Sequence, residues 1–149
     1  MQQMRTHTSS PMRTIMAGLT YFALVFGAGF VLGAIRVPFL VPRLGERIAE
    51  LIEMPFMFVI VLLSARFVAI RFSLPAGASA RLCVGLLALG LLLVAEFLLA
   101  VTTQDRSLRE YIVSRDPISG SVYLAMLVLF ALMPFILVRV NSGGERHVA

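Results

Sequence analysis

Long runs of apolar residues dominate this sequence, and short polar segments separate them. The four apolar tracts each approach the roughly 20 residues that an α-helix needs to cross the hydrocarbon core of a bilayer. Backbone amides inside a bilayer must be paired within the segment, so helices are the expected structure of these tracts. The pattern predicts an all-α integral membrane four-helix bundle, a single domain over residues 1–149. Its spans are expected at about residues 14–36, 54–72, 81–102 and 118–140.

The first tract follows Arg5 and Arg13 and therefore resembles a secretory signal peptide in its position. Its uncharged run, residues 14–35, is longer than the apolar region of a signal peptide, and no small-residue cleavage motif follows it. We expect it to be a retained span.

Prolines lie in two of the predicted spans. Pro55 falls in the first turn of the second span, where the amide that proline lacks would be unpaired in any case. Pro134 lies well inside the fourth span. It cannot donate to the carbonyl of Phe130, four residues earlier, so a bend is expected there.

Two connections have the pattern of short amphipathic interfacial helices. Between Arg43 and Glu53, Leu44, Ile48, Leu51 and Ile52 form one face, and Glu46, Arg47, Glu50 and Glu53 form the other. In the third connection, Ser107 and Glu110 have the spacing of a capping box. With four spans, both segments lie on the same side of the membrane. The alternative is that both are linkers packed against the ends of the bundle.

Arginine supplies all 13 basic residues, and most of them lie near the ends of spans. This scattered distribution argues against a nucleic-acid partner, which needs basic residues gathered on one face. Basic residues are enriched in cytoplasmic connections. Each side of the membrane has six arginines near span ends, and Arg66, in the inner part of the second span, adds one to the side of the termini. Both termini are therefore expected in the cytoplasm, and the two amphipathic connections in the periplasm.

The segment GAGFVLGAIRVPFLVPRLGERIAELIEMPFM, residues 27–57, resembles uncharacterised small bacterial inner-membrane proteins with four predicted transmembrane helices. The resemblance covers mainly the first two spans and the connection between them. It implies a multi-pass protein of the bacterial inner (plasma) membrane, and it implies no activity.

The predicted spans lack the residues that several kinds of catalytic and metal site require. Both histidines, His7 and His147, lie in the tails, so no span offers an imidazole to haem or to a metal. Cys83 is the only cysteine and cannot form an intramolecular disulfide. We therefore predict no catalytic residues, no cofactor and no metal site.

Apart from arginines at their ends, the predicted spans contain two charged residues, Arg66 and Glu96. A charge costs about 2.5 to 3.5 kcal/mol at mid-bilayer. At about 1.5 Å of rise per residue their depths differ by roughly 13 Å, so a direct salt bridge between them is not expected. The intramembrane polar groups instead sort by depth into an outer and an inner layer.

The outer layer groups Glu96 with Arg36, Glu53 and Tyr123. A carboxylate beside Arg36 would stay ionised and hold helices together, whereas one that contacts only Tyr123 and lipid could carry a proton.

The inner layer groups Arg66 with Tyr21 and with the carbonyl of Phe130 that Pro134 leaves unpaired. The alternative is that the long side chain of Arg66 extends to the lipid headgroups. Gly29 and Gly33, one turn apart, predict a small-residue face where another helix can approach closely.

The leading functional prediction is an accessory or interaction protein without catalytic activity, with the lipid bilayer and either a second copy or another membrane protein as partners. The alternative is an oligomeric small transporter or channel that uses Glu96 as a proton- or cation-coupling residue. In outline it resembles the small multidrug exporters, but those have their essential glutamate in the first span, and here that span has no acidic residue. A lipid-headgroup enzyme using Arg36, Glu53 and Glu96 is the third and weakest interpretation.

Overall fold

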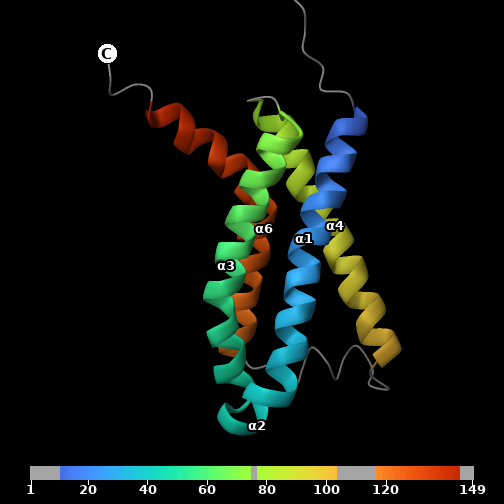
Figure 1. The fold of residues 1–149 in the computed structure, drawn as a ribbon, viewed down its shortest axis with the longest axis vertical. Coiled ribbons are helices and arrows are strands. Elements are labelled where there is room, and N and C mark those ends of the chain that lie inside the picture. The colour runs from blue at the N-terminus through green and yellow to red at the C-terminus, as the bar shows by residue number, and fades with distance from the viewer. Residues whose placement is uncertain (1–10, 75–76, 104–116, 145–149) are drawn as a thin grey trace, which may run out of the picture.

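The molecule has four long helices, which run side by side (Figure 1). The computed structural model describes residues 11–74, 77–103 and 117–144. The long helices are α1 (Pro11–Ile35), α3 (Glu46–Arg71), α4 (Ala78–Thr103) and α6 (Pro117–Gly144). A π-helical turn, η1 (Arg36–Leu40), and a single α-helical turn, α2 (Val41–Leu44), join α1 to α3. Among the described residues none lies in a strand, and the predicted all-α class is confirmed.

All four long helices are long and apolar enough to cross a membrane, as a multi-pass membrane protein requires. Large apolar side chains such as Phe56, Leu63 and Ile70 are exposed on the outside of the bundle. Lipid is a suitable neighbour for such a surface, whereas a soluble monomer rarely exposes large contiguous apolar areas.

The helices are arranged as a ring in the order α1, α4, α6, α3. The hairpins α1–α3 and α4–α6 each consist of antiparallel neighbours, whereas α1 and α4 run in the same direction, as do α3 and α6 (Figure 1). The chain therefore crosses a diagonal of the ring between α3 and α4. The bundle is two hairpins placed side by side.

The first connection differs from its prediction. Helix α3 already begins at Glu46, so residues 46–53 form its first two turns rather than a separate interfacial helix. Gly45, with φ of 79°, reverses the chain between α2 and α3, and this left-handed conformation favours glycine. Pro55 consequently lies inside α3, not in a first turn. The helix predicted from Ser107 lies outside the described residues.

Near the ends of the chain the bundle is tightly packed, at the level of Gly18, Tyr21 and Gly85; we call this the closed half. A methyl group built on Gly18 would lie 2.7 Å from Cδ2 of Leu87, on the neighbouring α4. At Gly85 it would collide with the carbonyl group of Ala131 in α6. Backbones approach this closely only where a side chain is missing.

Pro134 is buried inside α6, and the last part of this helix leans away from the bundle (Figure 1). The missing amide of Pro134 leaves the carbonyl of Phe130 without its helical donor, as the sequence predicts. The hydroxyl of Tyr21 donates to this carbonyl at 2.9 Å, and the two aromatic rings stack with centroids 4.6 Å apart. One tyrosine thus satisfies the carbonyl and joins α1 to α6 across the diagonal.

Candidate functional site

A cavity of about 250 Å³ lies in the other half of the bundle, nearest α2. We call this the cavity half. All four long helices line the cavity: residues 25–36 of α1 and η1, 50–61 of α3, 92–99 of α4 and 123–130 of α6. Most of the lining is apolar, with phenylalanine, methionine and leucine side chains. Its ionisable and phenolic members are Arg36, Glu50, Glu53, Glu96 and Tyr123.

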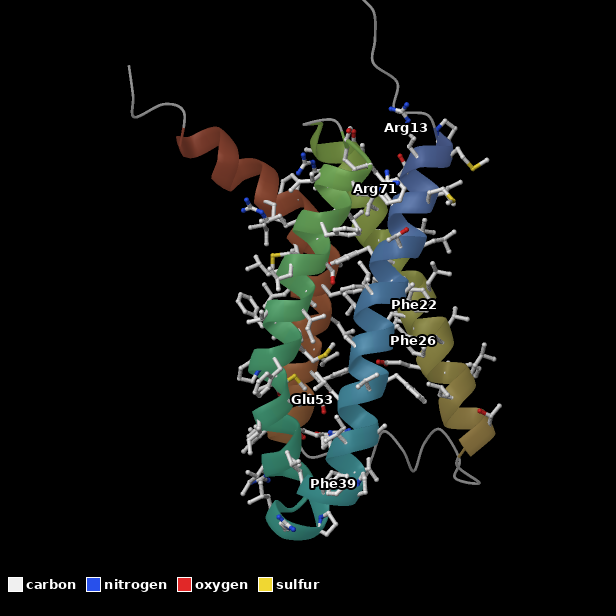
Figure 2. All side chains as sticks on the ribbon, viewed as in Figure 1. Arg13, Phe22, Phe26, Phe39, Glu53 and Arg71 are labelled. Carbon is white, nitrogen blue, oxygen red and sulfur yellow. The ribbon has the colours of Figure 1, made fainter. Side chains whose placement is uncertain are left out.

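Arg36 is held by two carboxylates of α3. Its Nη1 atom lies 3.1 Å from Oε1 of Glu50, and its Nε atom lies 3.0 Å from Oε2 of Glu53. The two glutamates are three residues apart and therefore share one face of α3. Figure 2 shows Glu53 on the side of α3 that faces α1. The reversal at Gly45 produces this clamp, because it folds the start of α3 back along the end of α1.

The clamp is largely removed from solvent. The side chain of Arg36 is 23% exposed, and those of Glu50 and Glu53 are 15% and 14% exposed. The facing Nε and Oε2 atoms of Arg36 and Glu53 have almost no accessible surface. Attraction between charges is stronger in such an environment than in water, and so is the penalty for leaving one of them unpaired.

Glu96 and Tyr123 form a second polar pair, within the other hairpin. The hydroxyl of Tyr123, in α6, donates to Oε2 of Glu96, in α4, and both side chains are partly buried. In the part of the chain that the structure describes, Glu96 contacts no basic side chain. The carboxyl group of Glu96 therefore faces the cavity beside a neutral partner.

Four residues of the predicted outer layer, Arg36, Glu53, Glu96 and Tyr123, thus line one cavity. The expected contact between Glu96 and Tyr123 is present, whereas Arg36 pairs within its own hairpin rather than with Glu96. Sequence reasoning did not include Glu50 in this cluster. The amphipathic pattern of residues 43–53 already placed Glu50 and Glu53 on one polar face, and this shared face was the available signal.

The inner layer is not assembled as expected. The hydroxyl of Tyr21, not the guanidinium group of Arg66, donates a hydrogen bond to the carbonyl of Phe130. Arg66 is exposed, because it lies two positions from both Ser64 and Val68, and these two residues face the core. At about 100° per residue, a displacement of two positions turns the side chain to the opposite side of the helix. This exposed position agrees with the headgroup alternative for Arg66.

Gly29 and Gly33 line the cavity rather than a tight helix contact of this chain. A methyl group on Gly29 would meet only the flexible end of Met57, at 3.4 Å, and one on Gly33 would meet nothing within 4 Å. Packing of these glycines against another molecule stays a prediction. The glycines that permit close approach in the bundle are Gly18 and Gly85, which the sequence analysis missed. The spacing of Gly85 and Ala88, two small residues on one face, was the available signal.

The site brings ionisable and phenolic groups together around the cavity. Among residues 11–74, 77–103 and 117–144, no group of three histidine, cysteine or acidic side chains is placed to hold a metal ion. Comparisons with protein-family models, curated proteins and solved structures found no match to this chain. The cavity, the Arg36 clamp and the Glu96–Tyr123 pair are therefore the basis for a functional proposal.

Proposed function

We propose that the protein is a small multi-pass membrane transporter or channel that uses Glu96 as its proton- or cation-coupling residue. The observation that carries this proposal is the position of Glu96, which borders the cavity with a neutral tyrosine as its partner. A carboxylate in a span is costly, and such residues commonly mark the path of an ion or a proton.

A purely structural role explains this arrangement less well. Buried ion pairs contribute little net stability compared with well-packed apolar residues of similar volume, and an unfilled volume forfeits packing contacts. A bundle that needed only to hold together would gain from leucine at these positions. The retained cavity and its excess of carboxyl groups over guanidinium groups support a binding function.

The proposed location of the protein is the bacterial inner membrane, with both termini in the cytoplasm. Arg13 and Arg71 lie at the same end of the bundle (Figure 2), and Arg66 lies towards that end in α3. Arg36, Arg43 and Arg47 lie at the opposite end, so Arg66 decides the balance. An excess of arginines at one end favours the retention of that end in the cytoplasm. A reporter active only in the periplasm, fused to Ala149, should give no signal, and one active only in the cytoplasm should give a strong signal. The reverse pattern would contradict this orientation.

Proteoliposomes with an acidic interior and a trapped pH dye test the coupling. Adding external sodium, potassium or benzyltrimethylammonium should discharge the gradient for at least one of these cations, because entry of the cation releases a proton from Glu96. Glu96→Gln should abolish this discharge. Glu46→Gln is the matched control, since Glu46 is exposed and does not line the cavity. A gradient that no cation discharges, or equal discharge by Glu96→Gln, would contradict the proposal.

The second candidate is an accessory subunit that binds another membrane protein. Gly27 and Gly90 favour it, because both are exposed and a methyl group on either would meet nothing within 4 Å. Such exposed small residues let a further helix approach. Purification in mild detergent with a stoichiometric second protein would support this candidate. A homo-oligomer by light scattering, with gradient discharge in vesicles, would support the transporter.

A further inference from the structure

We propose that the cavity binds an organic monocation, an amine or quaternary ammonium group attached to an apolar body somewhat larger than benzene. This inference rests on the proposed function and names the class of molecule that the cavity takes.

The charge of the lining selects a cation. The described lining contains one guanidinium group and three carboxyl groups, and the two carboxylates of Glu50 and Glu53 already share Arg36. The third, Glu96, has only the neutral hydroxyl of Tyr123 as its partner among the described residues. An anion entering the cavity would meet an excess of negative charge, whereas a single positive charge would balance Glu96.

The walls select an organic cation over a metal ion. Ions such as Ca²⁺ and Mg²⁺ require about six or more oxygen ligands, and the lining is mostly carbon. Phe26, Phe30 and Phe130 contribute aromatic rings, whose faces attract ammonium groups. Met57 and Met126 add flexible side chains that adapt to ligands of different shapes. Figure 2 shows Phe26 on the side of α1 towards α4, between the two hairpins.

The volume of the cavity sets the size of the occupant. A cavity of about 150 Å³ lined by apolar side chains binds benzene, so the 250 Å³ available here accepts a benzene ring with an alkylammonium substituent. The position of Glu96 orients the molecule. Its ammonium group lies beside Glu96 and Tyr123, and its ring lies deeper in the bundle, towards Val25, Val61 and Phe130.

Calorimetric titration of the purified full chain with benzyltrimethylammonium, in a maltoside detergent, tests this inference. The native protein should bind it saturably. Glu96→Gln should weaken binding at least tenfold, although the glutamine oxygen can still accept from Tyr123, and Glu46→Gln should bind like the native protein. Neopentylbenzene, the uncharged isostere, should not compete.

A second variant fills the cavity without touching a charge. Gly33→Leu adds a side chain to an open lining position, so the helices should still pack and binding should be lost. Gly27→Leu is its control, since Gly27 is outside the lining and a side chain there meets nothing within 4 Å.

Lack of saturable binding by a native protein with an intact helical spectrum would overturn the inference. Equal competition by neopentylbenzene, with no effect of Glu96→Gln, would also overturn it, because the cavity would then be a site for neutral apolar molecules. Binding of benzyltrimethylammonium without gradient discharge by any cation would support the inference and contradict the proposed function. Discharge by sodium or potassium without benzyltrimethylammonium binding would support the proposed function and contradict the inference.

Discussion

The closed half and the cavity half are built from the same four helices, but their glycines have opposite consequences. In the closed half, Gly85 removes a side chain so that two backbones can touch. In the cavity half, Gly33 also lacks a side chain, but a methyl group built there would meet no atom within 4 Å. A glycine in these helices therefore permits close packing only where the backbone of a neighbouring helix lies directly beside it. The same residue type elsewhere leaves space for a ligand.

The polar groups of the two halves differ in the same way. In the closed half, one neutral hydrogen bond from Tyr21 satisfies a backbone carbonyl, and the surroundings are packed. In the cavity half, several charged groups surround an open volume. Close backbone packing is concentrated in the closed half, and the ionisable groups that face the interior are concentrated where packing is incomplete.

Gly85→Ala should have the largest effect on stability. The added methyl group collides with the backbone of Ala131, which cannot rotate away, so α4 and α6 must separate. We expect a loss of about 3 kcal/mol or more in the free energy of unfolding, at the upper end of overpacking effects. Unfolding in detergent with increasing SDS, followed by circular dichroism, measures it. Gly90→Ala is the control in the same helix, and a gain of up to about 1 kcal/mol is expected there.

Arg36→Gln should have the next largest effect, because it leaves Glu50 and Glu53 without their cation. The partial burial of the group places the expected loss at about 2 kcal/mol, between exposed and fully buried pairs. A double-mutant cycle with Glu53→Gln should show strong coupling, and one with Glu96→Gln should be additive. Strong coupling between Arg36 and Glu96 would join the two polar pairs into one network and contradict their separation into hairpins.

Tyr21→Phe should cost about 1 to 2 kcal/mol, since the carbonyl of Phe130 loses its donor while the aromatic stack remains. Pro134→Ala supplies the missing amide within α6. Combining the two changes should shrink the cost of Tyr21→Phe to a few tenths of a kcal/mol. An undiminished cost in the double variant would mean that Tyr21 acts through packing and not through its hydroxyl.

Gly33→Leu should have the smallest effect on stability. The open position accepts the side chain, and leucine favours the helix over glycine by up to about 1 kcal/mol. We expect unfolding at an unchanged or slightly higher SDS concentration than for the native protein. A large loss would show that Gly33 packs against a second copy or another protein, as its spacing from Gly29 first suggested.

Apolar tract length was sufficient to predict the four helices, because the bilayer fixes how many residues a span needs. Depth along each span was sufficient to relate Glu96 to Tyr123, since the rise per residue is constant. The start of α3 was not predictable in this way. Glu46 and Arg47 made the segment resemble a surface helix. In the structure the break in the helix lies earlier, at the left-handed Gly45, and the residues after it are continuous with the span.

The rotation of each helix about its own axis was the other quantity that the sequence pattern did not predict. Arg66 and Tyr21 have comparable depths, yet Arg66 faces outward and Tyr21 faces the core. An all-apolar span has little amphipathic contrast, so its pattern does not state which face is buried. Only the packing partners, such as Leu87 beside Gly18, settle that rotation.

The ring order of the helices also bears on how the chain enters the membrane. Each polar cluster of the cavity belongs to a single hairpin: the Arg36 clamp joins η1, at the end of α1, to α3, and Tyr123 with Glu96 joins α4 to α6. Each hairpin can therefore leave the insertion machinery with its cavity-lining ionisable groups already in contact with their partners. Among the described residues, the contacts between hairpins include an apolar one, Gly18 against Leu87, and a neutral one, Tyr21 on Phe130. Assembly of the two hairpins thus leaves the Arg36 clamp and the Glu96–Tyr123 contact intact, and the cavity forms at the seam where the hairpins meet.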